Sequence, residues 1–320
     1  MKKLSYGIIS ASSIVSRFIR AVKETNHSQV VAIASQSNKA TQIAKDFEIE
    51  KVYSSYTDIY QDPDIDIVYI ANINDQHFTE IKNALNHNKH VLCEKPIVLL
   101  PEEVNEIFEL AKEKNRFLME AQKAPFLPVS KHVKKIIDEE TLGKLVKVTL
   151  NNSYGGRHPD GHWMHEAHQG GVWIPSANYA LEYLHVLLGD SPLEANALLS
   201  TYGEQKTIDE ALVNLRYPND VMVQLSFTTR VITDDMTKFY FENGWVEVFQ
   251  NWKARYLTIH RLNQDIERID YPVEHELVYE VDHVYEMISQ QKITSDVMTP
   301  EVTYDCVSLV HEIYLLTQED

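Results

Sequence analysis

The chain has 320 residues, of which 44% are hydrophobic and 24% charged, and its 30 basic and 47 acidic side chains give a net charge of −17. This length favours two domains, at roughly 150 residues each. An acidic chain without a basic patch argues against direct nucleic-acid binding. The two cysteines, Cys93 and Cys306, cannot form a disulfide framework and favour a reducing, cytoplasmic compartment. No run of about 18 apolar residues predicts a membrane span, and no secretory leader is expected.

The first part of the chain alternates between short apolar runs and segments of helical period. Apolar runs at 4–10, 30–37, 64–72, 89–97 and 116–122 predict strands, and helices are expected over 13–25, 38–48, 75–88 and 102–115. Continuous apolar strands that alternate with helices indicate a doubly wound parallel sheet covered on both faces. We therefore expect a Rossmann-type domain over residues 1–121, with ligands at the carboxyl ends of its strands.

After residue 121 the pattern changes. A helix is expected over 124–140, and alternating apolar and polar residues follow at 144–154, 211–218, 221–231, 238–249 and 254–262. Such alternation predicts a large, mostly antiparallel sheet with one open face. Helices over 277–290 and 303–316 close the chain. We expect residues 122–320 to form an α+β domain that binds substrate and oligomerises through its sheet.

The turn after the first predicted strand lies where a dinucleotide-binding fingerprint would have glycines. The G-x-G-x-x-G/A positions are occupied by Ser10, Ser12 and Val15. Since backbone N–H groups and the helix dipole bind the pyrophosphate, small serines there are compatible with a cofactor. The alternative is that Ser12 or Ser13 is an ordinary N-cap, and the turn alone does not decide between them. At the end of the second strand, Gln36 is neither the carboxylate typical of NAD sites nor the arginine typical of NADP sites.

The stretch HVLCEKP at 90–96 carries the strongest signal, because it places Lys95 at the carboxyl edge of the predicted sheet. Together with IANINDQH before it, MEAQ after it, and the later HQGGVWIPSANY, ENGWVEV and SDVMTPE, the chain resembles the Gfo/Idh/MocA superfamily of oxidoreductases over nearly its whole length. The dihydrodiol dehydrogenase and glucose–fructose oxidoreductase-like branch is the most similar in these motifs. The resemblance implies an NAD(P)-dependent dehydrogenase or reductase that acts on CH–OH groups of a sugar, polyol, diol or related small molecule.

The resemblance also implies roles for individual residues. Lys95 and Tyr179 correspond to catalytic positions, and a lysine and the positive nicotinamide ring beside such a tyrosine are expected to lower its pKa. Pro96 is expected to take the cis form. The cofactor, NAD or NADP, would be held by Ser10, Ala11, Ser12, Ile14, Ser35, Gln36, Ala71, Asn72, Asn74, His77, Glu94, Lys95, Gln122 and Trp163.

Two features depart from the family pattern. Pro175 stands where relatives have an aspartate that places substrate hydroxyls, which puts substrate choice and activity itself in question. Close before it, four histidines fall within eleven residues. We expect three of them, His162, His165 and His168, to contact substrate. The alternative is that the cluster is a metal site. We predict no metal, because Pro159 and Gly161 favour a loop here, whereas a helix would be needed to bring the imidazole rings to one point.

Three functions stay open from the sequence. The first is the oxidoreductase, the second a non-catalytic NAD(P)-binding sensor or regulator of the same fold, and the third a metal-dependent enzyme. The expected partners are a small-molecule substrate and a second copy of the chain in a homodimer or homotetramer, with no nucleic acid and no membrane.

Overall fold

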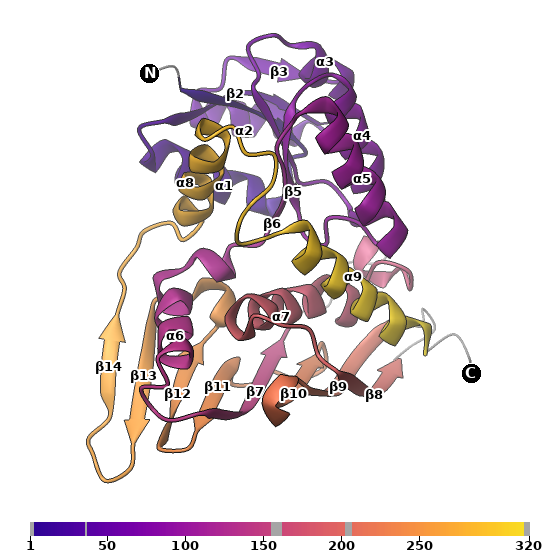
Figure 1. The fold of residues 1–320 in the computed structure, drawn as a ribbon. Coiled ribbons are helices and arrows are strands. Elements are labelled where there is room, and N and C mark those ends of the chain that lie inside the picture. The colour runs from indigo at the N-terminus through magenta and orange to yellow at the C-terminus, as the bar shows by residue number, and fades with distance from the viewer. Residues whose placement is uncertain (1–2, 36, 155–161, 202–206, 317–320) are drawn as a thin grey trace. The chain divides into compact units, whose positions relative to one another are not determined.

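The computed structural model describes residues 3–35, 37–154, 162–201 and 207–316 (Figure 1). The chain divides into two compact units. The first unit comprises Met1–Gln122 and His275–Val307, and the second comprises Lys123–Glu274 and Ser308–Asp320. The segment 275–307, which the sequence analysis placed with the second domain, thus packs with the first unit.

The first unit is built on a six-stranded parallel sheet in the order β3-β2-β1-β4-β5-β6. Its strands are β1 (Leu4–Ile9), β2 (Ser28–Ala34), β3 (Lys51–Tyr53), β4 (Ile67–Ile70), β5 (His90–Glu94) and β6 (Leu118–Ala121). Every residue of β1 and β4 is buried, as expected when both faces of a parallel sheet are covered. The strand order reverses between β1 and β4, where ligands of open α/β sheets bind. The predicted Rossmann fold is confirmed.

Helices connect these strands in the alternation that the sequence predicts. They are α1 (Ser13–Glu24), α2 (Lys39–Phe47), α3 (Tyr56–Gln61), η1 (Asn74–Gln76), α4 (His77–Asn86) and α5 (Pro101–Lys114). One apolar face of each longer helix lies on the sheet, and in α1 that face is Val15, Phe18, Ile19 and Val22.

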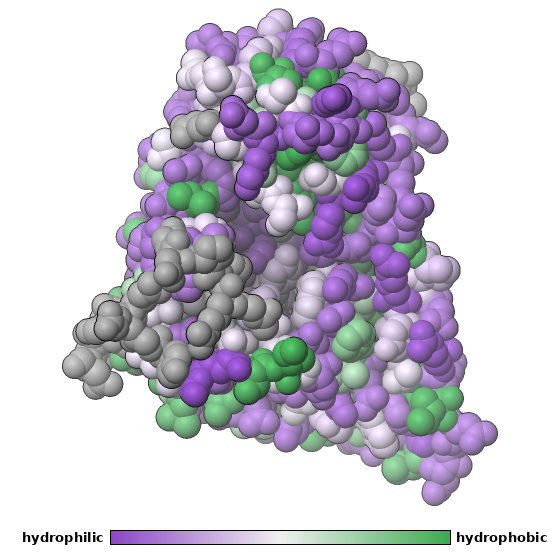
Figure 2. Space-filling model, turned by 180° about the vertical axis from the view of Figure 1, so that it is seen from behind, coloured by the Kyte–Doolittle hydropathy of each residue, from purple (hydrophilic) through white to green (hydrophobic). Residues whose placement is uncertain are grey.

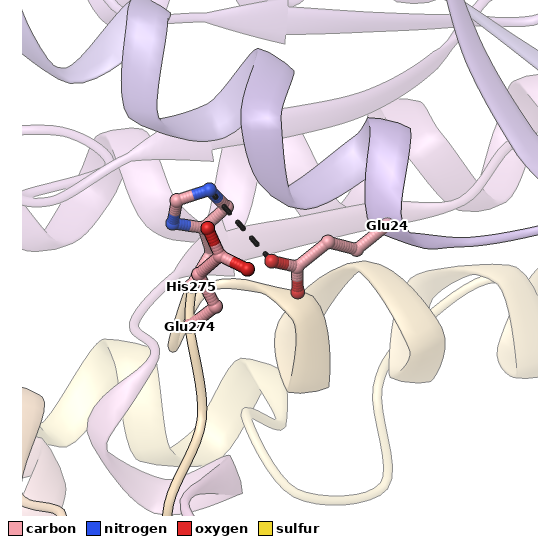
Figure 3. A group of neighbouring side chains, drawn as sticks. All are labelled: Glu24, Glu274 and His275. Atoms are coloured by element: carbon pink, nitrogen blue, oxygen red, sulfur yellow. Dashed lines mark ion pairs between the residues drawn. The ribbon is translucent and has the colours of Figure 1, made fainter.

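Two later helices lie in the segment after the second sheet, α8 (Val278–Ser289) and α9 (Pro300–Leu315). Polar contacts hold α8 and the residues just before it against α1 and the residues that follow α1. Arg17 pairs with Glu276, and His27 Nε2 lies 2.9 Å from Asp282 Oδ1. Figure 3 shows a further pair, Glu24 with His275, at 3.7 Å. These pairs explain why a segment far along the chain belongs to the first unit.

The second unit is built on an eight-stranded sheet in the order β14-β13-β12-β11-β7-β10-β9-β8. All its neighbours are antiparallel except β7 and β10, which are parallel. Its strands are β7 (Leu145–Ser153), β8 (Glu194–Thr201), β9 (Ile208–Arg216), β10 (Met222–Thr228), β11 (Met236–Phe241), β12 (Gly244–Phe249), β13 (Tyr256–Arg261) and β14 (Glu267–Asp270). The mostly antiparallel sheet is confirmed.

Helices α6 (Pro128–Asp138) and α7 (Trp173–Leu188) cover one face of this sheet (Figure 1). Trp173 of α7 packs edge-on against Phe227 of β10, and Tyr183 packs against Phe239 of β11, with ring centroids 5.8 and 6.2 Å apart. The helix expected over 124–140 begins only at Pro128. Residues Ala124–Phe126 form a 3₁₀ turn (η2) instead, since a proline cannot continue an α-helix that precedes it.

On the face drawn in Figure 2, hydrophilic side chains cover most of the surface, and apolar residues form small separate groups. Within the described residues, the structure has no helix with the length and apolar character that a bilayer crossing requires.

His90, the first residue of β5, is a titratable group built into the first unit. Its Nδ1 accepts a hydrogen bond from the backbone N–H of Phe117 at 2.9 Å. Burial, helped by the nearby charge of Arg116, lowers the pKa of His90 to about 4. The folded protein therefore keeps this ring neutral down to a pH at which the unfolded chain has already bound a proton.

We predict that His90 makes the protein less stable in mild acid. Since the folded pKa is below the unfolded one, the stabilisation is present above pH ~6.5 and is lost as the pH falls towards ~4. The free energy of unfolding in urea should drop by about 1 to 2 kcal/mol more between pH 7 and pH 5 in the wild type than in His90→Asn. The asparagine amide oxygen can still accept from Phe117 but does not titrate. An equal drop in both proteins would contradict the prediction.

Candidate active site

The turn after β1 is closed by serine hydroxyls. Ser10 has φ 114°, a backbone region that favours glycine, and its Oγ accepts a hydrogen bond from the N–H of Ser12 at 3.0 Å. Ser12 precedes α1, but its side chain makes no capping bond and donates instead to the carbonyl of Ala71, at the end of β4, at 2.9 Å. Ser12 therefore occupies the N-cap position of α1, but its side chain does not cap the helix.

The beginning of α1 fits a dinucleotide pyrophosphate. The first N–H groups of a helix have no partner within the helix, and the helix dipole makes this end positive. No acidic residue stands in the first turn of α1 to repel an anion. Ala11, Ser12 and Ile14 are half-buried, so a ligand can approach the backbone of this turn.

Two serines that follow β2 contact each other. Ser35 Oγ lies 3.0 Å from Ser37 Oγ and accepts from the Ser37 N–H at 3.1 Å. Gln36 lies outside the described residues. Ser35 thus lies directly after β2, at the strand end where the adenosine ribose binds in Rossmann folds.

His77 links the loops that follow β4 and β5. It is fully buried, with Nδ1 2.8 Å from the carbonyl oxygen of Pro96 and Nε2 3.3 Å from that of Asn72. Burial lowers the pKa of His77, so the ring is neutral and donates from one nitrogen at a time. Asn74, in η1, is buried as well. The geometry supports His77 as a residue that holds the Lys95 loop.

Two more side chains fix the same loop. The Tyr69 hydroxyl donates to Glu94 Oε1 at 2.6 Å, and the N–H of Ile97 donates to Glu120 Oε1 at 2.9 Å. The Lys95–Pro96 peptide bond is cis, as expected. Lys95 is half-buried and sits on a loop that β4, α4 and β6 all hold. Sequence reasoning missed Tyr69, although a buried tyrosine in the neighbouring strand needs a partner for its hydroxyl.

In the second unit, Tyr179 lies in the second turn of α7 and is half-buried. Pro175 occupies the third position of α7, where a helix needs no backbone N–H, so the proline is tolerated. The Lys123 Nζ lies 3.5 Å from the Tyr179 hydroxyl oxygen. Sequence reasoning missed Lys123. Gln122, at which the first segment of the first unit ends, is fully buried.

The histidine segment forms the 3₁₀ turn η3 (Trp163–His165). His162 caps it, with Nδ1 accepting from the Met164 N–H at 3.2 Å, and its ring lies 5.6 Å from that of Trp163. His168 lies 3.8 Å from the Glu166 carboxylate. The ring nitrogens of the three described histidines, His162, His165 and His168, do not all lie within 4.8 Å of one another. His158 lies outside the described residues.

Comparison with known proteins places these features in a family. The family model described as "Oxidoreductase family, NAD-binding Rossmann fold" matches residues 4–122, and the GFO/IDH/MocA C-terminal domain matches residues 130–247. The chain belongs to the Gfo/Idh/MocA oxidoreductase family. Its first unit carries the NAD-binding Rossmann domain of that family, and the resemblance seen in the sequence is confirmed.

Curated relatives of this Gfo/Idh/MocA protein include mammalian enzymes. It is 31% identical to the trans-1,2-dihydrobenzene-1,2-diol dehydrogenase of Sus scrofa over 71% of this chain and 68% of the relative. The Homo sapiens enzyme of the same name is 30% identical over 71% of each chain.

Two solved structures share the fold of this Gfo/Idh/MocA protein. A 3-ketoreductase from Actinomadura kijaniata, in complex with NADP and TDP-benzene, has a TM-score of 0.87 at 21% identity, covering 97% of this chain and 96% of the other. An aldose-aldose oxidoreductase from Caulobacter crescentus, complexed with glycerol, has a TM-score of 0.88 at 19% identity, covering 99% and 98%.

The positive φ of Ser10 gives a prediction that separates strain from hydrogen bonding. Ser10→Ala keeps the unfavourable φ and loses the bond to Ser12, so its free energy of unfolding should fall by about 1 kcal/mol. Ser10→Gly loses the same bond but relieves the strain, so it should lie within about 1 kcal/mol of the wild type. Urea unfolding of the wild type and the two variants measures both changes in the free energy of unfolding. A glycine variant less stable than the alanine variant would show that the turn is not strained.

Proposed function

We propose that the protein transfers a hydride between nicotinamide and a carbinol or carbonyl carbon of a sugar, polyol, diol or related small molecule. The observation that carries this proposal is a connected set of contacts along the carboxyl edge of the first sheet. Ser12 bonds the end of β4, His77 bridges Asn72 and Pro96, and Lys95 lies on the loop so fixed. The turn proposed to bind phosphate and the lysine proposed to be catalytic are thereby linked along one edge of the sheet.

The cofactor, NAD or NADP, supplies the redox chemistry when bound. The backbone of Ser10, Ala11, Ser12 and Ile14 would hold the pyrophosphate at the positive end of α1. The residues proposed for the rest of the cofactor are Ser35, Gln36, Ala71, Asn72, Asn74, Glu94, Gln122 and Trp163. The burial of His77 and its two carbonyl contacts support a positioning role for it beside them.

Lys95 and Tyr179 are proposed to handle the proton. In the reducing direction, the oxygen of the substrate carbonyl gains negative charge as its carbon accepts hydride. An ammonium group such as that of Lys95 stabilises this charge and orients the oxygen. A phenol such as that of Tyr179 supplies the proton. The mammalian relatives named as diol dehydrogenases support a CH–OH substrate.

His162, His165 and His168 are proposed to contact substrate hydroxyls in place of the aspartate that Pro175 replaces. Their half-buried or exposed side chains support this role, since each ring can accept or donate. Single alanine variants should raise the KM for substrate and leave the dissociation constant of the dinucleotide unchanged. Unchanged kinetics in all three would exclude the role.

Pro175 favours a second function, a sensor or regulator that binds NAD(P) without turnover. A proline at the third position of α7 offers no side-chain group to a substrate hydroxyl. Saturable NADH or NADPH binding with no turnover across a broad panel of sugars, polyols and diols would select this function.

We propose that the open face of the second sheet forms a homodimer or homotetramer. Leu198 of β8 lies opposite Leu212 of β9, and these leucines are 71% and 48% exposed. Light scattering of the wild type and of Leu198→Asp should show a smaller assembly in the variant, and a monomeric wild type would refute the proposal. A cytoplasmic location is also proposed, which the two free, buried cysteines support and cell fractionation would test.

The test of the enzyme function is a reductase and dehydrogenase screen on the full chain. With the best substrate found, Lys95→Met and Tyr179→Phe should each lower kcat by about 100-fold or more, because each removes a group that handles the proton. Their unfolding midpoints should match that of the wild type. Lys112→Met, at an exposed position of α5, removes the same charge and should keep full activity. Full activity of Lys95→Met would refute the assignment.

A further inference from the structure

Lys123 is a buried cation beside the proposed proton donor. It is the first residue of the second unit and only 4% exposed. Its Nζ lies 3.5 Å from the Tyr179 hydroxyl oxygen and 5.3 Å from the centroid of the Tyr179 ring. The ammonium thus stands close to both the oxygen and the π-system of one phenol.

The ammonium of this contact is withdrawn from water, since Lys123 is only 4% exposed, whereas Tyr179 is half-buried. Within the second unit, η2, α6, β9 and β10 pack on α7. Of these, β9 carries the acidic residues Asp209 and Glu210, which are half-buried. The charged groups of α6, among them Lys131 and Lys134, are half-exposed or exposed. On α7 itself, Glu182 follows Tyr179 by one turn and is fully buried. A charge interaction in such surroundings is weakened less by water and salt than one at the surface.

We propose that Lys123 is a positioning residue for proton transfer at Tyr179, orienting its hydroxyl and stabilising the phenolate that forms when the proton leaves. This inference rests on the proposed function. In the reducing direction, a bound reduced nicotinamide would supply the hydride, with its electron pair, to the carbonyl carbon. The carbonyl oxygen takes a proton from Tyr179 as that O–H bond breaks. The phenolate faces the Lys123 ammonium until solvent returns the proton.

The role differs from the one proposed for Lys95. Lys95 would act on the substrate oxygen directly, whereas Lys123 acts through the phenol. A neutral side chain of similar length at 123 leaves the apolar packing in place but removes the charge that favours the phenolate. An arginine keeps the charge, so the pair Lys123→Met and Lys123→Arg separates charge from packing.

The first experiment needs no turnover. The absorbance of tyrosinate near 295 nm is titrated with pH in the wild type and in Tyr179→Phe, and the difference isolates Tyr179. The same difference is taken in the Lys123→Met background. Tyr179 should ionise at a pH higher by about one unit or more when Lys123 is methionine. Lys123→Arg should restore the wild-type value, and an unchanged titration in Lys123→Met overturns the inference.

The second experiment is a double-mutant cycle on the full enzyme with the substrate found above. Lys123→Met should lower kcat by about 10-fold or more, with KM changed less than about 3-fold, and Lys123→Arg should recover most of the loss. In the Tyr179→Phe background, Lys123→Met should have almost no further effect, because the two residues act as one unit. Additive losses overturn the inference.

Failure of the enzyme function and failure of this inference give different results. If no substrate is turned over, the proposed function fails, and the tyrosinate titration still decides whether Lys123 controls Tyr179. If the enzyme is active and the titration of Tyr179 does not respond to Lys123, only the inference fails. A lower unfolding midpoint in both Lys123 variants, with no shift in the titration, would show a purely structural lysine.

Discussion

The carboxyl edge of the first sheet depends on one buried imidazole. His77 contacts the carbonyl oxygens of Asn72 and Pro96, which follow two neighbouring strands. Burial lowers its pKa, so the ring stays neutral and holds both loops through a hydrogen bond and a close polar contact. The Lys95 loop gains two more anchors from Tyr69 and Glu120. In the catalytic role proposed for Lys95, a loop held from three elements would need little reorganisation during the reaction, and preorganised charge is most effective there.

The serine-substituted turn shows why a glycine pattern is a poor test for a dinucleotide site. Backbone N–H groups and the helix dipole bind a pyrophosphate, so the side chains of such a turn need only be small enough to let the ligand reach the backbone. Ser10 adopts the positive φ that the fingerprint's first glycine supplies, and the hydroxyls of Ser10 and Ser12 close the turn. The cost of the backbone conformation is offset locally by hydrogen bonds that glycines cannot make.

Much of this was predictable from sequence, for physical reasons. Apolar runs and helical periods identified the parallel sheet, because burial on both faces leaves few polar residues in its strands. The order of the sequence motifs identified the family, and with it the positions of Lys95 and Tyr179. The anchoring of 275–307 to the first unit was not predictable, since it depends on pairs such as Arg17–Glu276 between residues far apart in sequence. Lys123 was missed because one lysine after a strand has no local signature. Its role is inferred from its contact with Tyr179, which lies 56 residues later in the sequence.

Dinucleotide titration of a charge variant tests the central claim, that the first turn of α1 binds a pyrophosphate. Ser13 is exposed at the first position of α1, where an aspartate favours the helix but repels an anion. The control is Asn86→Asp, which adds the same negative charge as Ser13→Asp but at the end of α4, before β5 begins. NADH and NADPH fluorescence should give saturable binding to the wild type and to Asn86→Asp, and binding weakened about 10-fold or more in Ser13→Asp. Equal affinity in all three proteins, or no saturable binding to the wild type, would contradict the account.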